Sequence, residues 1–394
     1  MKIVIATPIL YDASSPFNHL FKDIIEGFLN AGHHIIRIVA CENKNEDGYK
    51  LGIEHDNIRY IPVVRKRTDH GNIIQRYTSD VFTAIKMTKI IRKIKADVLF
   101  EDVCYSSYWT VKTAKKTKMK VVSMLQDVWP DNAVQSGLIH EKSLLYKYFE
   151  IWQQAVYKKS DRIICISDDM KAFVKSKGIL DDKISVIYNW GYSDETIDIS
   201  WSENLFVKKY NLSRDKFYAI YAGNIGRMQN VELIIRAAKK LASKSNIQFL
   251  IIGDGAYKDN IEKEVIDNHL NNVTMLPLQE PTLATSIYSA AGVNIIPLVP
   301  GGIKTALPSK TGVCLSCGRP VVFCFDKQSV FHQLCKKYNS GKCVNANDED
   351  DLVEALLEYS SGETKRSQGA FNMYKDLFTR TANIRKYSDV LEKI

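Results

Sequence analysis

The sequence predicts an α/β protein of two doubly wound domains that face each other across a cleft. Strand-like apolar runs alternate with helix-length segments from start to end, which is typical of parallel sheets built from βαβ units. The chain has 394 residues, too many for one ordinary domain. The alternation lapses once, between Trp190 and Arg214, where Gly, Ser, Asp, Glu and Asn are frequent. We therefore expect a linker there and one domain on each side of it.

Each domain is expected to contain one parallel sheet. In the first half, the apolar runs that predict strands cover residues 2–7, 34–40, 58–64, 97–100, 120–125, 162–166 and 184–188. In the second half they cover residues 217–221, 248–252, 273–276, 293–297, 320–325 and 341–344. The segments between these runs have helical length and spacing. This order gives a doubly wound, Rossmann-like arrangement in both halves.

The domain boundaries follow from this pattern. We expect a first domain over residues 1–195, a second over 196–370, and a carboxyl-terminal helix over 371–394 that packs on the first domain. The last segment has helical spacing at Phe371 and Tyr374, and again at Tyr387 and Leu391, with a break near Thr379. A helix with a break there can cross back to the first domain.

Composition and charge restrict the class of protein. No apolar run reaches the roughly 20 residues that a membrane-spanning helix needs, and the first strand is too short to be a signal peptide. Eight cysteines lie mostly within apolar stretches, so we expect reduced thiols and a cytoplasmic location. Cys314 and Cys317 form the only CxxC pair, which is insufficient for a zinc site.

The net charge of +9 is concentrated in one segment. From Arg59 to Lys120 there are fifteen Lys and Arg residues against five Asp and Glu residues. Such a basic segment with an apolar helix face is consistent with a peripheral contact to an anionic membrane, at the inner face of the cell membrane. It is equally consistent with a solvated helix that packs on its own sheet. No nucleic-acid-binding motif accompanies the charge, so we do not expect nucleic acid as a partner.

The most informative motif is Pro308-Ser309-Lys310, which opens a short helix before Gly318-Arg319-Pro320. Proline fixes φ, the helix start leaves backbone N–H groups free, and lysine adds a cation. Together these features suit a diphosphate. The following strand places the loop at the carboxyl edge of a parallel sheet, where α/β folds bind ligands.

Two glycine turns also follow strands of the second half. One contains Gly223, Asn224 and Gly226 followed by Arg227, and the other contains Gly253 and Gly255. Glycine lets the backbone approach a phosphate closely, and an arginine can bind it in a bidentate way. Either turn alone is a weak signal, but three strand-end loops at one sheet edge predict a nucleotide diphosphate pocket. Neither turn is a Walker A loop, and the first strand lacks a GxGxxG sequence, which argues against a dehydrogenase.

In the first half, candidate residues follow two strands. Asp127 comes directly after a buried strand and could accept a proton from a hydroxyl or bind a sugar hydroxyl. Trp129 offers a flat ring suited to the apolar face of a sugar. Ser15, Asn18 and His19 follow the first strand and are weaker candidates for the acceptor side, since a histidine there is often a packing or capping residue.

Further segments occur along the chain in the order expected of one enzyme family. They are Gly32-His33, Gln126 to Pro130, Ile164 to Ser167, Val186 to Trp190, the Gly223 to Gly226 turn, and Pro308-Ser309-Lys310 followed by Gly318-Arg319-Pro320. With the paired domains, these segments resemble the GT-B glycosyltransferases. Within them the chain resembles the subgroup of the retaining family four that builds capsule, colanic-acid and O-antigen sugars.

This resemblance implies a sugar nucleotide donor bound by the carboxyl-terminal domain, an acceptor bound by the amino-terminal domain, and no required metal or other cofactor. Cations and N–H groups would stabilise the leaving diphosphate, as Mg²⁺ does in other enzymes. The residues implied to bind the donor are Asn224, Arg227 and Lys310 with the Ser309 N–H for the diphosphate, and Pro277 and Leu278 for the base. Relatives carry two glutamates where this chain has Thr305 and Val313, which leaves the anomeric outcome open.

The sequence thus predicts a glycosyltransferase that moves a hexose or N-acetylhexosamine from a UDP-sugar to a lipid-linked or saccharide acceptor in surface polysaccharide biosynthesis. The candidates for catalysis are Asp127, Arg227 and Lys310. Two alternatives stay open. One is an isomerase similar to UDP-N-acetylglucosamine 2-epimerase, which would need no acceptor. The other is a non-catalytic partner subunit that binds a sugar nucleotide.

Overall fold

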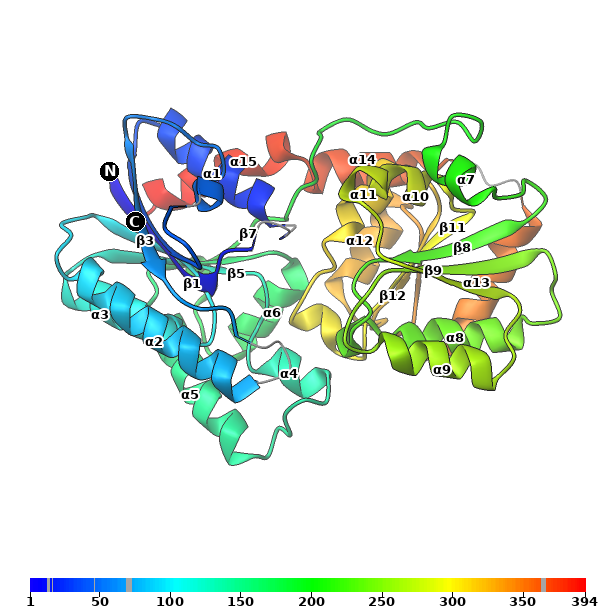
Figure 1. The fold of residues 1–394 in the computed structure, drawn as a ribbon, viewed down its shortest axis with the longest axis horizontal. Helices are drawn as coiled ribbons and strands as arrows, with labels where there is room; N and C mark the ends of the chain where they lie inside the picture. The colour runs from blue at the N-terminus through cyan, green and yellow to red at the C-terminus, as the bar shows by residue number, and fades with distance from the viewer. Residues whose placement is uncertain (13–14, 16, 46, 69–72, 363–365) are drawn as a thin grey trace. The chain divides into compact units, whose positions relative to one another are not determined.

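The computed structural model describes residues 1–12, 15, 17–45, 47–68, 73–362 and 366–394. Within these residues the strands form two parallel sheets, and the chain divides into two compact units (Figure 1). Unit 1 contains Met1–Asp131, Ile139–Tyr188 and Asn383–Ile394, and unit 2 contains Asn132–Leu138 and Asn189–Ala382. The predicted α/β class, with two parallel-sheet domains, is confirmed.

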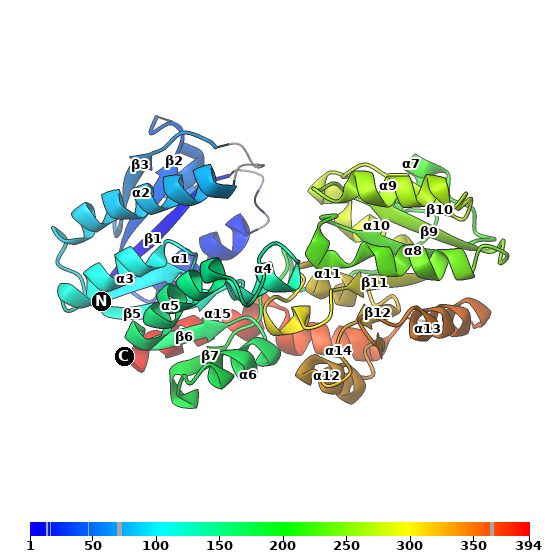
Figure 2. The same ribbon diagram turned by 90° about the horizontal axis from the view of Figure 1, so that it is seen from below.

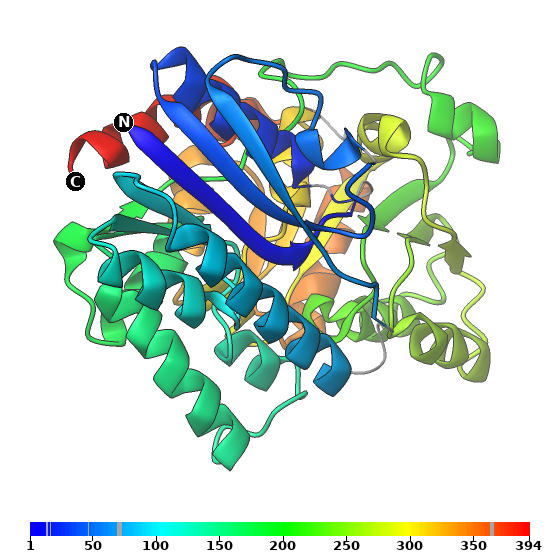
Figure 3. The same cartoon turned by 60° about the vertical axis from the view of Figure 1, so that its left-hand side comes forward.

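The sheet of unit 1 has the strand order β3-β2-β1-β4-β5-β6-β7. Figure 3 shows β1, β2 and β3, in blue, running side by side. The central strands are buried on both faces, as expected of near-continuous apolar runs in a parallel sheet. The strands are β1 (Lys2–Leu10), β2 (His34–Cys41), β3 (Ile58–Val64), β4 (Val98–Asp102), β5 (Lys120–Leu125), β6 (Arg162–Cys165) and β7 (Ile184–Val186).

Helices cover both faces of this sheet. Helices α2, α3 and α5 lie in a row on one face (Figures 1 and 2). On the other face, α1 and α15 meet where Ile384 approaches Gly27, and the rings of Phe28 and Tyr387 both contact Phe100. The helices of unit 1 are α1 (Asn18–Asn30), α2 (Ile73–Ile91), α3 (Ser107–Lys116), α5 (Leu144–Lys159), α6 (Asp168–Ser176) and α15 (Arg380–Glu392). The short helix α4 (Asp131–Gln135) lies between α3 and α5 in the chain, and its residues after Asp131 belong to unit 2.

The sheet of unit 2 has the strand order β10-β9-β8-β11-β12-β13, again all parallel. The chain reverses direction across the sheet between β8 and β11, which is the switch point where doubly wound folds bind ligands. The strands are β8 (Phe217–Ala222), β9 (Ile247–Ile252), β10 (Val273–Leu276), β11 (Val293–Pro297), β12 (Val321–Cys324) and β13 (Lys342–Val344).

Two helix layers enclose the sheet of unit 2. Helices α8, α9 and α13 bury an aliphatic core against one face, and α10, α11, α12 and α14 form the other layer. The helices are α7 (Leu205–Tyr210), α8 (Val231–Lys240), α9 (Lys258–Asp267), α10 (Ala284–Ala290), α11 (Lys310–Ser316), α12 (Val330–Tyr338), α13 (Glu349–Ser361) and α14 (Gln368–Leu377).

Two segments differ from the sequence-based expectation. The expected linker contains the short helix α7, which the Asn204 side chain caps and which buries Phe206 completely. One buried aromatic residue in six was too little periodicity to predict a helix. The break expected near Thr379 is found, since α14 ends at Leu377 and α15 begins at Arg380, but α14 packs on α11 and α12 within unit 2 and not on unit 1. Within the segment 371–394, only the residues after Ala382 belong to unit 1, because their apolar side chains complete the core of that unit.

Candidate functional site

The carboxyl edge of the unit 2 sheet brings the two glycine turns together. A Cβ atom on Gly253 would lie 1.9 Å from the carbonyl oxygen of Gly223, and one on Gly255 would lie 2.5 Å from the carbonyl oxygen of Ile225. Gly223, Gly253 and Gly255 all have positive φ, at +141°, +153° and +153°. The Ile225 N–H donates to the Asp254 carbonyl at 2.7 Å. Glycine is required here because the two loops touch through their backbones.

Lys310, the first residue of α11, joins this pair of loops. Its Nζ atom would lie 2.8 Å from a Cβ on Gly223, and it is 3.7 Å from the centre of the Tyr221 ring. The Nζ atom is buried and makes no hydrogen bond to any residue that the structure describes. Burial lowers the pKa of Lys310 to about 7. A buried ammonium group without an anion is unfavourable, so the site is suited to a negatively charged ligand.

Two buried tyrosines hold the first glycine turn in place. The Tyr221 hydroxyl donates to the Asn224 carbonyl, and the Tyr288 hydroxyl donates to the Ala222 carbonyl at 3.1 Å. Both tyrosines are almost fully buried. The turn is therefore fixed from beneath at two carbonyls, one on each side of Gly223. Neither tyrosine was predicted from the sequence, although Tyr221 stands two residues before the glycine that it supports.

Arg227 lies at the other end of the same turn. It is exposed, and its guanidinium carbon is 5.2 Å from the centre of the Tyr257 ring. The Asn224 amide donates to the Gln229 side chain at 3.1 Å. Lys310 thus contacts the first residue of the turn, and Arg227 is its last residue. The two predicted cations border one loop at one edge of the sheet.

The remaining predicted donor residues lie at the same edge. Pro277 and Leu278 follow β10, whose last carbonyl accepts a hydrogen bond from the Gly253 N–H at 3.0 Å. Leu278 is largely exposed beside this contact. Pro308 and Ser309 precede α11, and Ser309 is exposed. Since the strands are parallel, the loops after β8, β9, β10 and β11 all open at the carboxyl edge.

Thr305 and Val313 are the two positions where the resemblance to the glycosyltransferases led us to expect glutamates. Thr305 is fully buried, and its hydroxyl is bonded to the Gln135 side chain. The Gln135 amide also donates to the Gly301 carbonyl at 2.9 Å. Val313 makes van der Waals contact with the position of a Cβ on Gly191. Both positions are therefore filled by internal contacts of unit 2, and neither presents a carboxylate.

In unit 1, Asp127 lies beyond the carboxyl end of β5, where the sequence analysis placed it. The surrounding residues remove water from its carboxyl group, and this desolvation raises the pKa of Asp127 to about 6. Asp102 ends the neighbouring strand β4, and burial together with the charge of Asp127 raises the pKa of Asp102 to about 7. Two carboxyl groups thus share one sheet edge and disfavour simultaneous ionisation.

Asp102 and its neighbour Glu101 were not predicted from the sequence as site residues. Glu101 is fully buried, accepts a hydrogen bond from the Thr110 hydroxyl at 2.7 Å, and has a pKa that burial raises to about 8. The signal was present in the sequence, since an apolar run that ends in two adjacent carboxylates is unusual for a buried strand.

The other predicted residues of unit 1 lie in an aromatic cluster and at the start of α1. The Trp129 ring contacts Tyr105 and Phe149, with centroids 5.8 Å and 5.2 Å away, so it belongs to an aromatic cluster. Ser15 and Asn18 shape the turn that enters α1, where the Asn18 amide donates to the Asp12 carbonyl at 2.9 Å. His19 is half-buried in the first turn of α1.

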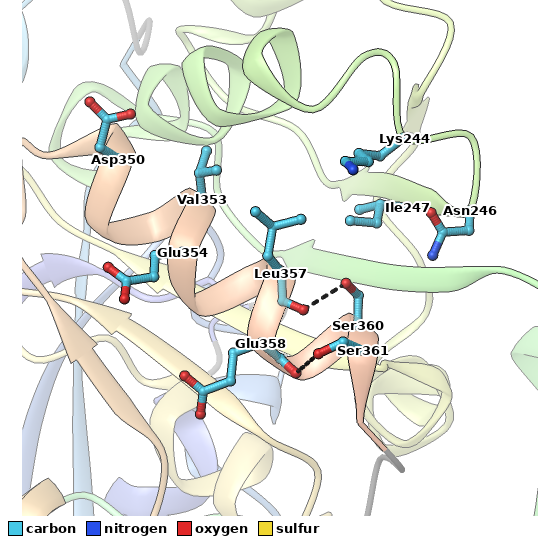
Figure 4. Close-up of a pocket in the computed structure, with 10 residues that line it drawn as sticks. All are labelled: Lys244, Asn246, Ile247, Asp350, Val353, Glu354, Leu357, Glu358, Ser360 and Ser361. Atoms are coloured by element: carbon cyan, nitrogen blue, oxygen red, sulfur yellow. Dashed lines mark hydrogen bonds between the residues drawn. The ribbon is translucent and has the colours of Figure 1, made fainter.

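A separate hollow lies away from these residues (Figure 4). It opens at the amino end of β9, beside Lys244 and Asn246, and α13 contributes Asp350, Glu354 and Glu358. This composition does not suit a diphosphate, because carboxylates outnumber the single lysine in the lining. In the described part of the chain, no group of His, Cys, Asp and Glu side chains could hold a metal ion.

Comparison with known families is consistent with this geometry. Residues 19–190 match the family model described as Glycosyltransferase Family 4, and residues 202–376 match the model described as Glycosyl transferases group 1. The two matches divide the chain near the boundary between its units. Together they place the chain in the superfamily of GT-B glycosyltransferases of group 1 and family 4.

Curated relatives are distant and match over part of their length. The chain is 25% identical over 244 residues to the probable glycosyltransferase WbjE of Pseudomonas aeruginosa. It is 26% identical over 199 residues to the putative colanic acid biosynthesis glycosyl transferase WcaI of Escherichia coli. These matches cover 61% and 50% of this chain, and 59% and 48% of the relatives. The chain therefore spans roughly half of the length of these two proteins.

Solved structures share the fold across the whole chain. Sucrose-phosphate synthase from Thermosynechococcus elongatus has a TM-score of 0.76 at 14% identity, with 100% of this chain and 98% of that chain covered. Anabaena Alr3699/HepE in complex with UDP has a TM-score of 0.73 at 12% identity, with 100% of both chains covered. WaaG, a glycosyltransferase involved in lipopolysaccharide biosynthesis, has a TM-score of 0.68 at 15% identity, with coverage of 98% and 99%.

Proposed function

We propose that this protein is a glycosyltransferase that moves a hexose or N-acetylhexosamine from a UDP-sugar to a lipid-linked or saccharide acceptor during surface polysaccharide synthesis. The observation that carries the proposal is the buried Lys310 ammonium group, which lies against the Gly223 turn without a hydrogen-bond partner among the described residues. The similarity to the glycosyltransferases WbjE and WcaI supports the reaction class, and the UDP bound by the similar protein HepE supports the donor.

The donor diphosphate would occupy the edge of the unit 2 sheet. Lys310 and Arg227 would neutralise it, with the Gly223 to Gly226 turn, the Gly253 to Gly255 turn and the Ser309 N–H in contact with its oxygens. Pro277 and Leu278 would border the uridine. As the bond between the sugar C1 atom and the diphosphate breaks, negative charge accumulates on the leaving oxygen. A cation already held at that position stabilises this charge without reorganisation.

Unit 1 would supply the acceptor side. Asp127, with its pKa raised to about 6, would bind the acceptor hydroxyl and take its proton as the new glycosidic bond forms. Ser15, Asn18, His19 and Trp129 are the further acceptor-side candidates. By resemblance to its superfamily, the reaction would retain the anomeric configuration and require no metal.

A lipid-linked acceptor would place the enzyme at the inner face of the cell membrane. The excess of Lys and Arg between Arg59 and Lys120 supplies positive charge for a peripheral contact with anionic lipid. Under this proposal the protein works as a peripheral enzyme, with a nucleotide sugar and a membrane-bound or soluble saccharide as substrates.

The function is tested by incubating the protein with a panel of UDP-sugars, with and without saccharide and polyprenyl-phosphate-linked acceptors. We expect UDP release and a product that contains donor and acceptor only when both are present. Conversion of the sugar nucleotide without an acceptor would identify an epimerase. Binding of UDP without turnover over the whole panel would identify a non-catalytic subunit. Lys310→Met should bind UDP weakly and transfer sugar at least about 100-fold more slowly.

A further inference from the structure

Helix α5 carries an apolar stripe that faces solvent. Its inner face buries Phe149, Val156 and Tyr157 in unit 1. Leu144, Tyr148 and Ile151 are spaced by four and three residues on a different face, and their side chains are 84%, 45% and 69% exposed. A surface helix of a globular domain needs one apolar stripe for its own core. Tyr148 packs on Phe149 and is hydrogen-bonded to Tyr77 of α2, but the exposed side chains of Leu144 and Ile151 are not needed for the core of unit 1.

Aromatic rings extend this stripe onto α3. The Tyr108 ring centre lies 3.9 Å from that of Trp152, and the Trp109 ring centre lies 5.5 Å from it. On α5 itself, the rings of Tyr148 and Trp152 are 5.8 Å apart. Tyr108, Trp109 and Trp152 are all partly exposed. Large partly exposed rings thus connect the outer sides of two neighbouring helices.

Lysines accompany these rings. The Lys112 ammonium group lies 5.1 Å from the Tyr108 ring centre and 6.0 Å from that of Trp109. On α2, which packs beside α3, Phe82 is 67% exposed and is followed on the same helix face by the exposed residues Lys86 and Lys89. Figures 1 and 2 show α2, α3 and α5 side by side on one face of the unit 1 sheet.

We propose that this surface docks on the interface of an anionic phospholipid bilayer. We call it the aromatic–basic face, and it consists of Phe82, Lys86, Tyr108, Trp109, Lys112, Leu144, Tyr148, Ile151 and Trp152. The proposal rests on the peripheral membrane contact of the proposed function and assigns its surface. It adds α5, which lies outside the basic segment and carries most of the apolar anchor.

Charge decides between a bilayer and a protein partner. The cores of protein–protein interfaces are depleted of lysine, whereas lysine beside Trp and Tyr is typical of side chains at a membrane surface. The segment from Arg59 to Lys120, which includes α2 and α3, has fifteen basic and five acidic residues. In the described part of the chain, no helix is both long enough and apolar enough to cross a membrane. Attachment at this face would be peripheral, through partial burial of rings and aliphatic side chains in the headgroup region.

The test is sedimentation of the purified full chain with vesicles, without donor or acceptor. We expect binding to phosphatidylcholine vesicles with about 30% phosphatidylglycerol, and much weaker binding to phosphatidylcholine alone. Raising the salt from about 0.1 M to about 0.5 M should weaken the binding, because it screens the lysines. Since no sugar transfer is measured, failure of docking and failure of the proposed function are distinguishable.

Matched variants locate the contact. Ile151 on α5 and Ile266 on α9 of unit 2 are both 69% exposed. Ile151→Ser should lower the partition coefficient about tenfold, the scale of an isoleucine taken partly out of water, and Ile266→Ser should leave it unchanged. Lys86→Gln should lower the partition coefficient about fivefold. Lys263→Gln, at an exposed position on α9, should leave the partition coefficient unchanged. Far-ultraviolet circular dichroism and thermal melting establish that each variant is folded.

Three outcomes would overturn the proposal. The first is the same vesicle binding by Ile151→Ser and Ile266→Ser. The second is no binding of the wild-type chain to the anionic vesicles. The third is a concentration-dependent dimer that Ile151→Ser dissociates, which would assign this face to a second copy of the chain instead.

Discussion

The ammonium group of Lys310 lies 3.7 Å from the centre of the Tyr221 ring. The ring face attracts the cation but supplies no hydrogen-bond acceptor, so the charge is held in position and left unneutralised. Gly223 closes the other side, where any larger residue would meet the lysine. This relationship keeps a cation ready at the strand-end turn where a diphosphate would bind, and the first two predictions depend on it.

Replacing this lysine separates its role in activity from its role in stability. Lys310→Met should reduce sugar transfer at least about 100-fold, because a charge that stabilises the leaving group is lost. The same change should raise the free energy of unfolding at pH 6 by roughly 1 to 3 kcal/mol, because an unpaired buried ammonium group is removed. Initial rates and urea denaturation measure the two effects. Lys336→Met, at an exposed position on α12, should change neither.

Binding of a diphosphate should be coupled to proton uptake. The pKa of Lys310 is lowered to about 7 in the free protein, and a bound anion raises it towards its ordinary value of 10.5. At pH 8 the free amine is mostly neutral and the bound amine is charged, so UDP binding should take up close to one proton. At pH 6 the uptake should vanish. Calorimetry in two buffers of different ionisation enthalpy measures this number, and equal uptake by Lys310→Met would contradict the assignment.

The carboxyl pair of unit 1 should make stability depend on pH. The pKa of Asp102 is raised from 3.8 to about 7 in the folded protein. Between these values the folded state binds the proton more strongly than the unfolded state, so its contribution to stability falls as pH rises. Asp102→Asn should therefore stabilise the protein at pH 8 by roughly 1 to 2 kcal/mol and have little effect at pH 4. Thermal melts of both proteins at the two pH values provide the comparison.

The same variant should leave the acidic limb of the sugar-transfer rate profile nearly in place. Asp127, with a pKa of about 6, ionises before Asp102, with a pKa of about 7, so Asp102 is still mainly neutral where Asp127 titrates. Asp127→Asn should abolish that limb together with most of the activity. A limb that moves to clearly lower pH in Asp102→Asn would show that Asp102 is already charged when Asp127 ionises.

Two glycine substitutions can separate the cost of a steric clash with a neighbouring loop from the cost of an unfavourable backbone conformation. Gly253 and Gly178 both have positive φ, at +153° and +84°, but only Gly253 has an atom within reach of an added Cβ. Gly178→Ala should cost about 1 to 2 kcal/mol of stability for the left-handed conformation alone. Gly253→Ala should cost clearly more and weaken UDP binding, because the Gly223 turn must move. Equal losses in the two variants, by urea denaturation, would argue against close contact between the loops.

Much of the fold was predictable because its pattern is local. Each of the expected strands is found, with ends that differ by a few residues, since apolar runs between polar segments mark buried parallel strands directly. The glycine turns and Pro308-Ser309-Lys310 were found for the same reason. Their positions at the ends of strands are properties of the sequence, and the parallel sheet then brings them to one edge.

Other properties of the site depend on contacts between distant residues. Nothing near Lys310 in sequence indicates that Tyr221 will lie beneath its amine. The pairing of Asp102 with Asp127 requires that β4 and β5 be neighbours, and the packing of Trp129 on Tyr105 and Phe149 requires the fold of the helix layer. Each of these contacts changes the charge or the accessibility of a residue that the sequence had already indicated as a candidate.

The composition of unit 1 from separated segments has a consequence for biosynthesis. Tyr387, Val390 and Leu391 are almost completely buried in this unit, yet they follow all of unit 2 in the chain. During translation, the apolar surface around Phe100 and Gly27 therefore stays exposed to water until α15 has been synthesised and can cover it. Unit 2 can mature first, and the half that begins synthesis is the last to reach its native state.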